Sequence, residues 1–203
     1  MKKLLILTLL ILSGCTSNES LKGRDISEGL PNDLEVHQDF ESHADYAIPT
    51  NLGQLEDEVS DIVYVKMIEN KEIGGWVEDD YNTTVTQVEV LDVFKGNTAV
   101  GQNLLISESY YLYEGKLETV EGYVPMESNE EYLLFLVDSD TESDLKLIQS
   151  MGFGKYHFDK QATEQPIQSF STLGEVKEYG LTHGESADLY NTIHEQILNK
   201  YNK

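Results

Sequence analysis

The chain of 203 residues contains one cysteine, Cys15, and places its thiol directly after an apolar run. Two lysines precede the apolar segment 4–12, and a Ser-Gly pair separates that segment from the thiol. A basic start, a short apolar segment and small residues before a cleavage point form the arrangement of an export signal. The apolar segment is too short to span a bilayer, which requires roughly 20 apolar residues in a helix. We therefore expect residues 1–14 to be a signal peptide.

The four residues L-S-G-C that end at Cys15 resemble the lipobox of bacterial lipoproteins. This resemblance implies that the thiol of Cys15 receives a diacylglyceryl group and becomes the first residue of the mature chain. Two or three acyl chains hold a protein stably on a membrane, at about 0.8 kcal/mol per buried methylene. The resemblance thus implies a lipid anchor on the extracytoplasmic face of the cell membrane; an ordinary signal peptide with a chance cysteine is the alternative. An acylated Cys15 also leaves no thiol for a disulfide, a nucleophile or a metal site.

The chain is strongly acidic, with 37 Asp and Glu residues against 14 Lys and Arg residues and a net charge of −23. Removing the signal peptide removes two lysines and brings the net charge to −25. Such a surface repels nucleic acid and anionic headgroups and favours cations or basic partners, with solubility alone as the alternative explanation. The only arginine, Arg24, lies in the stretch we assign to a tether, so no guanidinium is expected in the folded part for phosphate recognition. We expect neither a nucleic-acid nor a nucleotide partner.

Residues 138–144, DSDTESD, place carboxylates at alternate positions, as a calcium-binding loop does. Ser143 stands where such a loop needs glycine, and Gln149 stands where it needs a bidentate glutamate. We interpret the segment as a solvated hairpin turn, with weak cation binding as the alternative. The residues that would bind the cation are Asp138, Asp140, Glu142 and Asp144.

Two lysine motifs resemble catalytic or phosphate-binding signatures only in part. Ser143 and Lys146 have the spacing of a serine nucleophile and its lysine base, but they enter an expected strand, and no S-D-N or K-T-G motif accompanies them. The segment 152–155, GFGK, suggests a phosphate loop, yet Gln149 and Tyr156 replace the glycine and the hydroxyl residue that such a loop requires. We expect a chance match in the first case and turn glycines in the second.

The five histidines form no metal-binding motif. If one helix carried both His183 and His194, the 11 residue steps between them would span about 16 Å, too far for one ion. Segment 37–45 is denser, with two histidines and two aspartates, but we assign it to the tether, where ordering costs entropy; zinc binding there is the alternative. We expect neither a metal nor a cofactor.

The segment 15–43 is polar, of mixed charge and without an apolar period, which predicts a flexible tether. The remaining residues, 44–203, are enough for a single domain. A soluble chain that starts near Asp45 is therefore expected to fold as one unit.

The domain is expected to be mainly β, a closed or nearly closed small barrel with a short N-terminal helix and C-terminal helices packed on it. A helix is expected over 50–59, with Thr50 as its N-cap, and an apolar stripe at four-residue spacing predicts a final helix around 189–201. A change of the inward face at Val90 and Leu91 predicts a bulge. The expected strands, separated by turn residues, are 61–69, 83–97, 102–113, 116–124, 130–138 and 144–152.

Five segments, in order SDIVYVKMIENKE, TQVEVLDVFKGN, VGQNLLI, EEYLLFL and GFGKYHF, carry a further resemblance over about residues 50–160. They are similar to bacterial lipid-anchored envelope proteins of uncharacterised function. More distantly they resemble the netrin-like module of tissue inhibitors of metalloproteinases, which implies an OB-type barrel. In that module, inhibition depends on disulfides and on a free N-terminal cysteine that caps the catalytic zinc of the metalloproteinase. This chain has no disulfide partner and an acylated Cys15, so inhibition is not expected.

Two classes of function remain open. We favour a non-enzymatic module of the cell envelope that binds a protein, peptide or glycan through aromatic side chains, which give large contact area at low entropy cost. The candidates are Trp76, Tyr110, Tyr111 and Tyr113, for which strand packing is the alternative interpretation. The other class is a hydrolase or lyase of the cell wall that uses paired carboxylates such as Glu108, Glu78 or Asp79.

Overall fold

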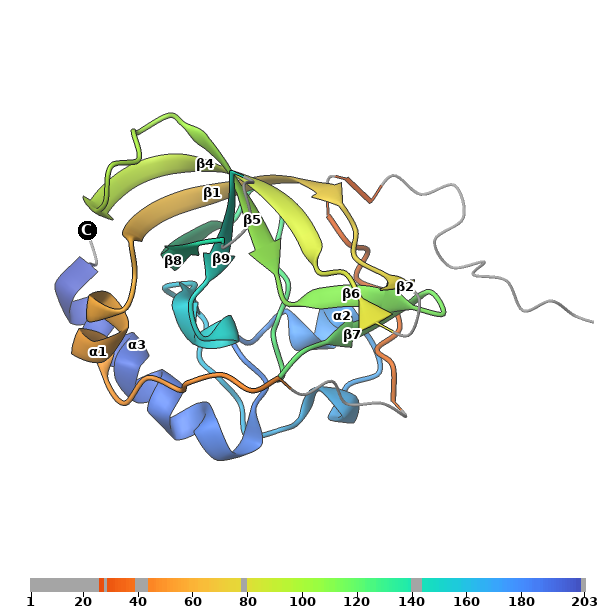
Figure 1. The fold of residues 1–203 in the computed structure, drawn as a ribbon. Coiled ribbons are helices and arrows are strands. Elements are labelled where there is room, and N and C mark those ends of the chain that lie inside the picture. Colours follow the sequence, from red (N-terminus) through yellow and green to blue (C-terminus); the bar gives the residue numbers. More distant parts are fainter. Residues whose placement is uncertain (1–25, 28, 39–43, 78–79, 140–143, 202–203) are drawn as a thin grey trace, which may run out of the picture.

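The computed structural model describes residues 26–27, 29–38, 44–77, 80–139 and 144–201 (Figure 1). It confirms the expected class, because the chain is mainly β, with 38% strand and 22% helix. The helices and strands, in chain order, are α1 (Leu52–Asp57), β1 (Asp61–Glu72), β2 (Trp76–Val77), β3 (Asp80–Tyr81), β4 (Thr84–Lys95), β5 (Asn103–Glu108), β6 (Tyr110–Tyr113), β7 (Lys116–Thr119), β8 (Glu131–Asp138), β9 (Leu145–Ile148), η1 (Met151–Gly154), β10 (Lys155–Tyr156), η2 (Ile167–Ser169), α2 (Leu173–Val176), η3 (Gly184–Ser186) and α3 (Ala187–Tyr201).

The main sheet closes into a ring of five strands. Its order is β1-β4-β5-β9-β8, and β8 pairs again with β1 to close the ring. Every pairing in the ring is antiparallel except the one between β5 and β9, which is parallel. Strand β10 extends the sheet beyond β8 over two residues, and β2-β3 and β6-β7 form separate two-stranded sheets. Closure leaves few unpaired edges in the main sheet.

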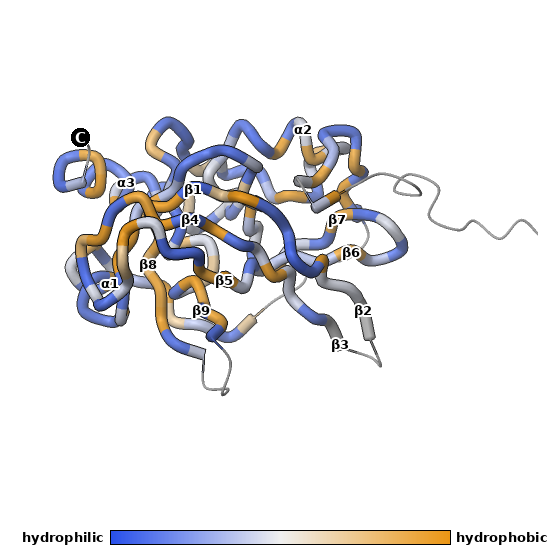
Figure 2. Tube along the Cα trace, turned by 90° about the horizontal axis from the view of Figure 1, so that it is seen from above, coloured by the Kyte–Doolittle hydropathy of each residue, from blue (hydrophilic) through white to orange (hydrophobic). Residues whose placement is uncertain are grey.

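Strand β8 is buried on both faces, which explains its continuous apolar sequence EYLLFLVD. Tyr132, Leu134 and Leu136 belong to the core inside the ring. Leu133 and Phe135 point the other way, into a second core formed with the buried residues of α1 and α3. In Figure 2 this strand is accordingly one of the hydrophobic stretches of the chain. One strand therefore joins the two cores.

The long pair β1-β4 contains the predicted bulge. Tyr64 pairs with Asp92 and Val65 pairs with Val90, so Leu91 is an extra residue on β4. Such an extra residue bends the strand and moves the following side chains to the other face. The burial agrees, because Val90 is fully buried while the residues from 91 to 93 are only half-buried.

The expected strand over 102–113 is two strands in the structure. The chain leaves the ring after Glu108, and Ser109 separates β5 from β6, which pairs with β7 in another sheet. The carbonyl of Ser109 accepts a hydrogen bond from the backbone N–H of Val120. The sequence has no glycine, proline or asparagine at this break, and the three polar residues 107–109 are its only local mark.

Residues 29–38, expected to be part of a tether, pack against the barrel and contribute to its core. Leu30, Leu34 and Val36 are 7%, 1% and 2% exposed and belong to the same buried cluster as the ring interior. The structure thus places the start of the domain well before residue 44. The three side chains follow no helical or strand period, which is why the pattern of the sequence did not predict their burial.

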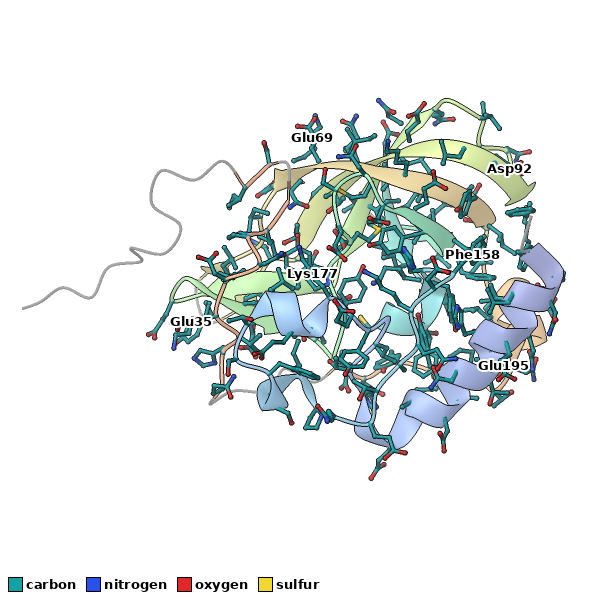
Figure 3. All side chains as sticks on the ribbon, turned by 180° about the vertical axis from the view of Figure 1, so that it is seen from behind. Glu35, Glu69, Asp92, Phe158, Lys177 and Glu195 are labelled. Atoms are coloured by element: carbon teal, nitrogen blue, oxygen red, sulfur yellow. The ribbon has the colours of Figure 1, made fainter. Side chains whose placement is uncertain are left out.

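Backbone and side-chain hydrogen bonds hold this segment in place. The N–H of His37 donates to the carbonyl of Leu117, and the N–H of Leu117 donates to the carbonyl of Glu35. On its other side, Lys177 after α2 donates to the Asn32 side chain at 2.9 Å (Figure 3). The segment therefore lies between β7 and the α2 region as an integral part of the domain.

The C-terminal helix docks on the barrel as predicted. Ile193, Ile197 and Tyr201 of α3 are buried in the second core, and Leu189 is half-buried at its edge. The first helix begins one residue later than expected, because its N-cap is Asn51 and not Thr50. The side chain of Asn51 accepts a hydrogen bond from the backbone N–H of Gln54. In the part of the chain that the structure describes, no helix has the length and apolar character that a membrane crossing requires.

Candidate functional site

A cavity of about 700 Å³ opens at one end of the ring. Its walls come from the start of β1, the connection between β4 and β5, the start of β5, and the facing ends of β8 and β9. In Figure 1 the connection between β4 and β5 lies at the upper left, whereas the segment 26–38 runs along the right side. The connection that lines the cavity therefore lies on the other side of the domain from the segment 26–38.

The carboxylate of Asp61 forms the fixed base of this cavity. Asp61 is 4% exposed and accepts hydrogen bonds from the hydroxyls of Ser60 at 2.9 Å and Thr98 at 3.0 Å. It also accepts one from the ammonium of Lys146 at 2.8 Å. Burial alone would raise the pKa of Asp61, but these three donors outweigh burial and hold its pKa below the usual value. A permanent negative charge thus lies at the base of the cavity.

Lys146 joins two carboxylates across the cavity. Its ammonium donates to Asp61 and, at 2.5 Å, to Asp138 at the end of β8. Burial would lower the pKa of Lys146, yet the hydrogen bonds from its ammonium to Asp138 and Asp61 raise it. The lysine therefore stays charged and ties β9 to the ends of β1 and β8.

The connection after β4 fits closely onto this charged group. Gly96 has a φ of +102°, and a Cβ atom on it would lie 2.1 Å from Oδ1 of Asp61. Only glycine combines that backbone conformation with such a close approach to the carboxylate. The Lys95-Gly96-Asn97 turn, which the sequence predicted as the end of a strand, thus also shapes the cavity wall.

A second polar group lies inside the ring, where no ligand reaches it. Glu108 is fully buried and accepts hydrogen bonds from Thr86 at 2.5 Å, Tyr123 at 2.9 Å and the N–H of Met126 at 2.8 Å. Burial raises the pKa of Glu108, although these donors and Lys155 oppose the effect. As a candidate catalytic carboxylate, Glu108 lies in the core and not in a cleft; Glu78 and Asp79 lie outside the described residues.

Lys155, from the glycine-lysine motif, supplies the opposite charge in this interior. Its ammonium donates to the carbonyl of Val124 at 2.5 Å and lies 4.7 Å from the ring centroid of Tyr123. Burial lowers the pKa of Lys155 to about 8, while the nearby Glu108 opposes that shift. The turn-glycine interpretation of this motif agrees with the structure, in which the glycines form the short helix η1 and the lysine enters β10.

The expected aromatic binding face is largely core. Tyr110 and Tyr111 are 0% exposed, so the alternative interpretation of strand packing holds for both. Tyr113 is half-buried, with its ring 5.4 Å from that of His37 in an edge contact. The backbone of Trp76 pairs with Tyr81 in the β2-β3 hairpin, and its side chain lies outside the described part of the chain.

The acidic turn contributes to the cavity only at its ends. Asp138 is hydrogen-bonded to Lys146, Asp144 is exposed and lines the cavity, and Asp140 and Glu142 lie outside the described residues. Ser143 of the serine-lysine motif also lies outside them. Within the residues that the structure describes, no three metal-ligating side chains gather at one point.

The histidines are distributed over separate parts of the fold. His194 is 2% exposed and stacks near Tyr156, with the two ring centroids 6.0 Å apart. His183 lies before α3, and its Nε2 is 3.1 Å from the carboxylate of Glu121, beside a smaller cavity of about 380 Å³. His37 lies 3.2 Å from Glu118, and His43 is outside the described residues.

No family model, curated protein or solved structure matches this chain.

Sequence patterns singled out Glu108, Lys146 and Lys155 separately, but they indicated neither Asp61 nor the pairs that these side chains form. Asp61 and Lys146 are 85 residues apart, and Glu108 and Lys155 come from different sides of the ring. The sequence offered one usable signal, the order of strands, because the start of β1 pairs with the end of β8 in the closed ring and so lies near the β8-β9 turn. A prediction that Asp61 and Lys146 meet also requires the register of the strands.

Proposed function

We propose that this chain is a lipoprotein anchored through Cys15 on the extracytoplasmic face of the cell membrane, and that its barrel binds an envelope ligand without catalysing a reaction. The observation that carries the proposal is the cavity at the end of the ring. Its volume of about 700 Å³ falls within the roughly 300–1,000 Å³ of small-ligand sites. Fixed charges at its base and a close-fitting glycine turn give it a preformed shape, which limits the cost of ordering on binding.

The arrangement of carboxylates supports binding over hydrolysis. Asp61 and Asp138 both accept hydrogen bonds from Lys146, which shares its charge between them. A hydrolase needs one carboxylic acid and one carboxylate with their pKa values set apart and both free to reach the substrate. A lysine between the two groups holds both in place, and at Asp61 it helps to keep the pKa below the usual value, so a fixed polar wall is the role we propose for them.

We further propose that the ring is an OB-like barrel, in keeping with the resemblance to the netrin-like module. The support is a closed ring of five strands whose third and fifth members, β5 and β9, are parallel neighbours. The OB fold is a five-stranded Greek-key barrel that binds ligands on strands two and three and on the loops after strands one and four. In this chain those strands are β4 and β5, and the cavity touches β5 and both ends of the loop after β8.

The proposed anchor places the domain near the membrane. Cys15 lies outside the described residues, and Ile26 is the first residue that the structure describes. Eleven residue steps separate the two, which reach at most about 40 Å at 3.3–3.6 Å per step. The reach is shorter than the expected tether of 15–43 would allow, so Ile26 must lie within this distance of the lipid surface.

Replacing Cys15 by Ala is expected to abolish lipidation and to release the protein from the membrane, since no other residue of the chain can form the thioether. Metabolic labelling with a palmitate analogue and fractionation of cells measure the two effects. The control variant Ser13→Ala keeps the thiol and a small residue before it, and it should label and sediment as the wild type does. Label incorporated into the Cys15→Ala variant would contradict the proposed anchor.

The cavity itself is tested by photocrosslinking in intact cells. A photoreactive amino acid at Asn97, which is exposed on the cavity wall, should capture a discrete envelope component. The same amino acid at Glu178, which is exposed in the α2 region, serves as the matched control and should not capture it. Identical products from both positions, or none from Asn97, would argue against the cavity as the binding site.

A further inference from the structure

The rim of the cavity combines a surplus of negative charge with a single cation. Asp61 lies at the base, Asp138 and Asp144 lie at the rim, and Lys146 is the one basic side chain among the described lining residues. Three carboxylates against one ammonium leave an excess of two negative charges. The net charge of −23 for the whole chain adds a long-range field of the same sign. The cavity is therefore electrostatically complementary to a ligand that carries a positive group.

The cavity also has apolar lining residues, and the neighbouring connection between β4 and β5 carries an exposed apolar side chain. Leu105, 37% exposed, lines the cavity together with Leu104 and Leu145. Val100 in the turn is 64% exposed, and Phe94 near the end of β4 is 39% exposed. Three of the four exposed large apolar side chains in the described residues thus lie between positions 94 and 105. Of these three, Leu105 lines the cavity, Val100 lies in the connection that forms its wall, and the ring of Phe94 contacts that of Tyr201 in α3, with centroids 4.8 Å apart. Exposed apolar groups beside a polar cavity are typical of an interaction surface.

The remaining lining residues distinguish between the possible partners. Asn97, Gln102 and Asn103 bring side-chain amides to the cavity, and such amides pair well with peptide groups. The described lining residues include no aromatic ring against which the flat face of a sugar could pack. The surplus of carboxylates also disfavours anionic lipid headgroups. A peptide fits this combination of charges, amides and apolar wall better than a glycan or a lipid.

We infer that the cavity accepts the basic side chain of an extended protein segment, and that apolar neighbours of this side chain pack on Leu105 and Val100. The inference rests on the proposed function and names its ligand class. The ammonium or guanidinium would lie between Asp138 and Asp144, where it replaces water around two carboxylates. The acidic surface would increase the association rate, and the affinity would fall as salt screens the charges.

The test uses the mature chain 15–203 with Cys15→Ala, so that the protein is soluble and otherwise complete. The probe is the peptide acetyl-Gly-Val-Lys-Leu-Gly-amide, whose lysine carries its only charge, and the matched peptide has norleucine in place of lysine. Titration followed by NMR should move the amide signals of residues 96–105 and 144–146 in a saturable manner. The norleucine peptide should bind about tenfold more weakly, the effect of one well-placed charge.

Matched protein variants localise the effect. Asp144→Asn should lower the affinity for the lysine peptide several-fold. Asp188→Asn, the same change at an exposed position of α3, should leave that affinity unchanged. Leu105→Asn should weaken both peptides alike, because it removes the apolar contact and not the charge. Equal affinity of the two peptides, or an equal effect of Asp144→Asn and Asp188→Asn, would overturn the inference.

The outcome is separable from that of the proposed function. Capture of an envelope component at Asn97 together with no binding of the lysine peptide would overturn the basic-segment inference and leave the binding cavity in place. Failure of both experiments would overturn both proposals.

Discussion

A chain that begins at Asp45 is expected to lose most of its stability, whereas a chain that begins at Ile26 should fold. The shorter chain lacks Leu30, Leu34 and Val36, each at most 7% exposed in the core inside the ring. Burying one such side chain contributes about 1.5–3 kcal/mol, so their joint removal costs about 5–9 kcal/mol. The total stability of a domain is only about 5–15 kcal/mol. The loss is therefore comparable with the total stability of the domain.

Urea unfolding followed by circular dichroism measures this effect. The chain 26–203 should show a single cooperative transition, and the chain 45–203 should show either a much lower midpoint or none. Within the longer chain, Leu34→Ala should cost about 2–5 kcal/mol, as for a large-to-small change in a packed core. The neighbouring Glu35, whose side chain is exposed, forms only a surface ion pair with Lys116 (Figure 3). Glu35→Ala should therefore change stability by no more than about 1 kcal/mol. Equal midpoints for the two chain lengths would contradict the packing of residues 29–38.

The second large effect is expected at alkaline pH, where the protein should unfold in a steep transition as pH rises through about 10. Burial raises the pKa of eight of the 12 tyrosines in the folded state: to about 12 for Tyr46, and likewise upward for Tyr64, Tyr110, Tyr123, Tyr132, Tyr156, Tyr190 and Tyr201. In the unfolded chain the same hydroxyls ionise near pH 10. Above that pH the unfolded state releases protons that the folded state keeps, so stability falls with rising pH.

The size of the slope follows from the number of protons. Each such tyrosine lowers the free energy of unfolding by about 1.4 kcal/mol per pH unit once the pH exceeds its unfolded pKa. Lys155 acts in the opposite direction: its folded pKa of about 8 lies below the usual value, so between that pH and its unfolded pKa the unfolded state binds the extra proton and stability rises. One lysine cannot balance eight tyrosines, and the loss of stability prevails above pH 10.

Absorbance of tyrosinate and circular dichroism, recorded together during a base titration, measure this transition. We expect ionisation and loss of structure to coincide in one steep step. Tyr156→Phe is a matched control, because the hydroxyl of Tyr156 is buried and has no hydrogen-bond partner among the described residues. The variant should be at least as stable at neutral pH and should unfold with a slope reduced by about one proton. Gradual ionisation of the tyrosines in a chain that stays folded would contradict the prediction.

Local patterns in the sequence predicted much of the secondary structure. Turn-separated β-rich segments located the five strands of the ring, and the change of face at Val90 and Leu91 predicted the bulge that the structure contains. The spacing of Ile193, Ile197 and Tyr201 predicted a helix that docks on the barrel. These features follow from residues within a few positions of one another, whose periodicity reports which face is buried. The export signal and Cys15 are likewise local, and they stay predictions because they lie outside the described residues.

Tertiary structure alone decided which residues form the core and which form the site. Leu30, Leu34 and Val36 are buried because their segment packs against β7 and the α2 region. The local spacing of apolar residues does not predict these contacts. The tyrosines expected at a binding face are buried because the chain leaves the ring at Ser109 and folds them inward. The charges of the cavity meet because closure of the ring brings the start of β1 against β9. A carboxylate and an ammonium far apart in sequence have no local signature, since their interaction depends on the register of five strands and not on the residues that surround either one.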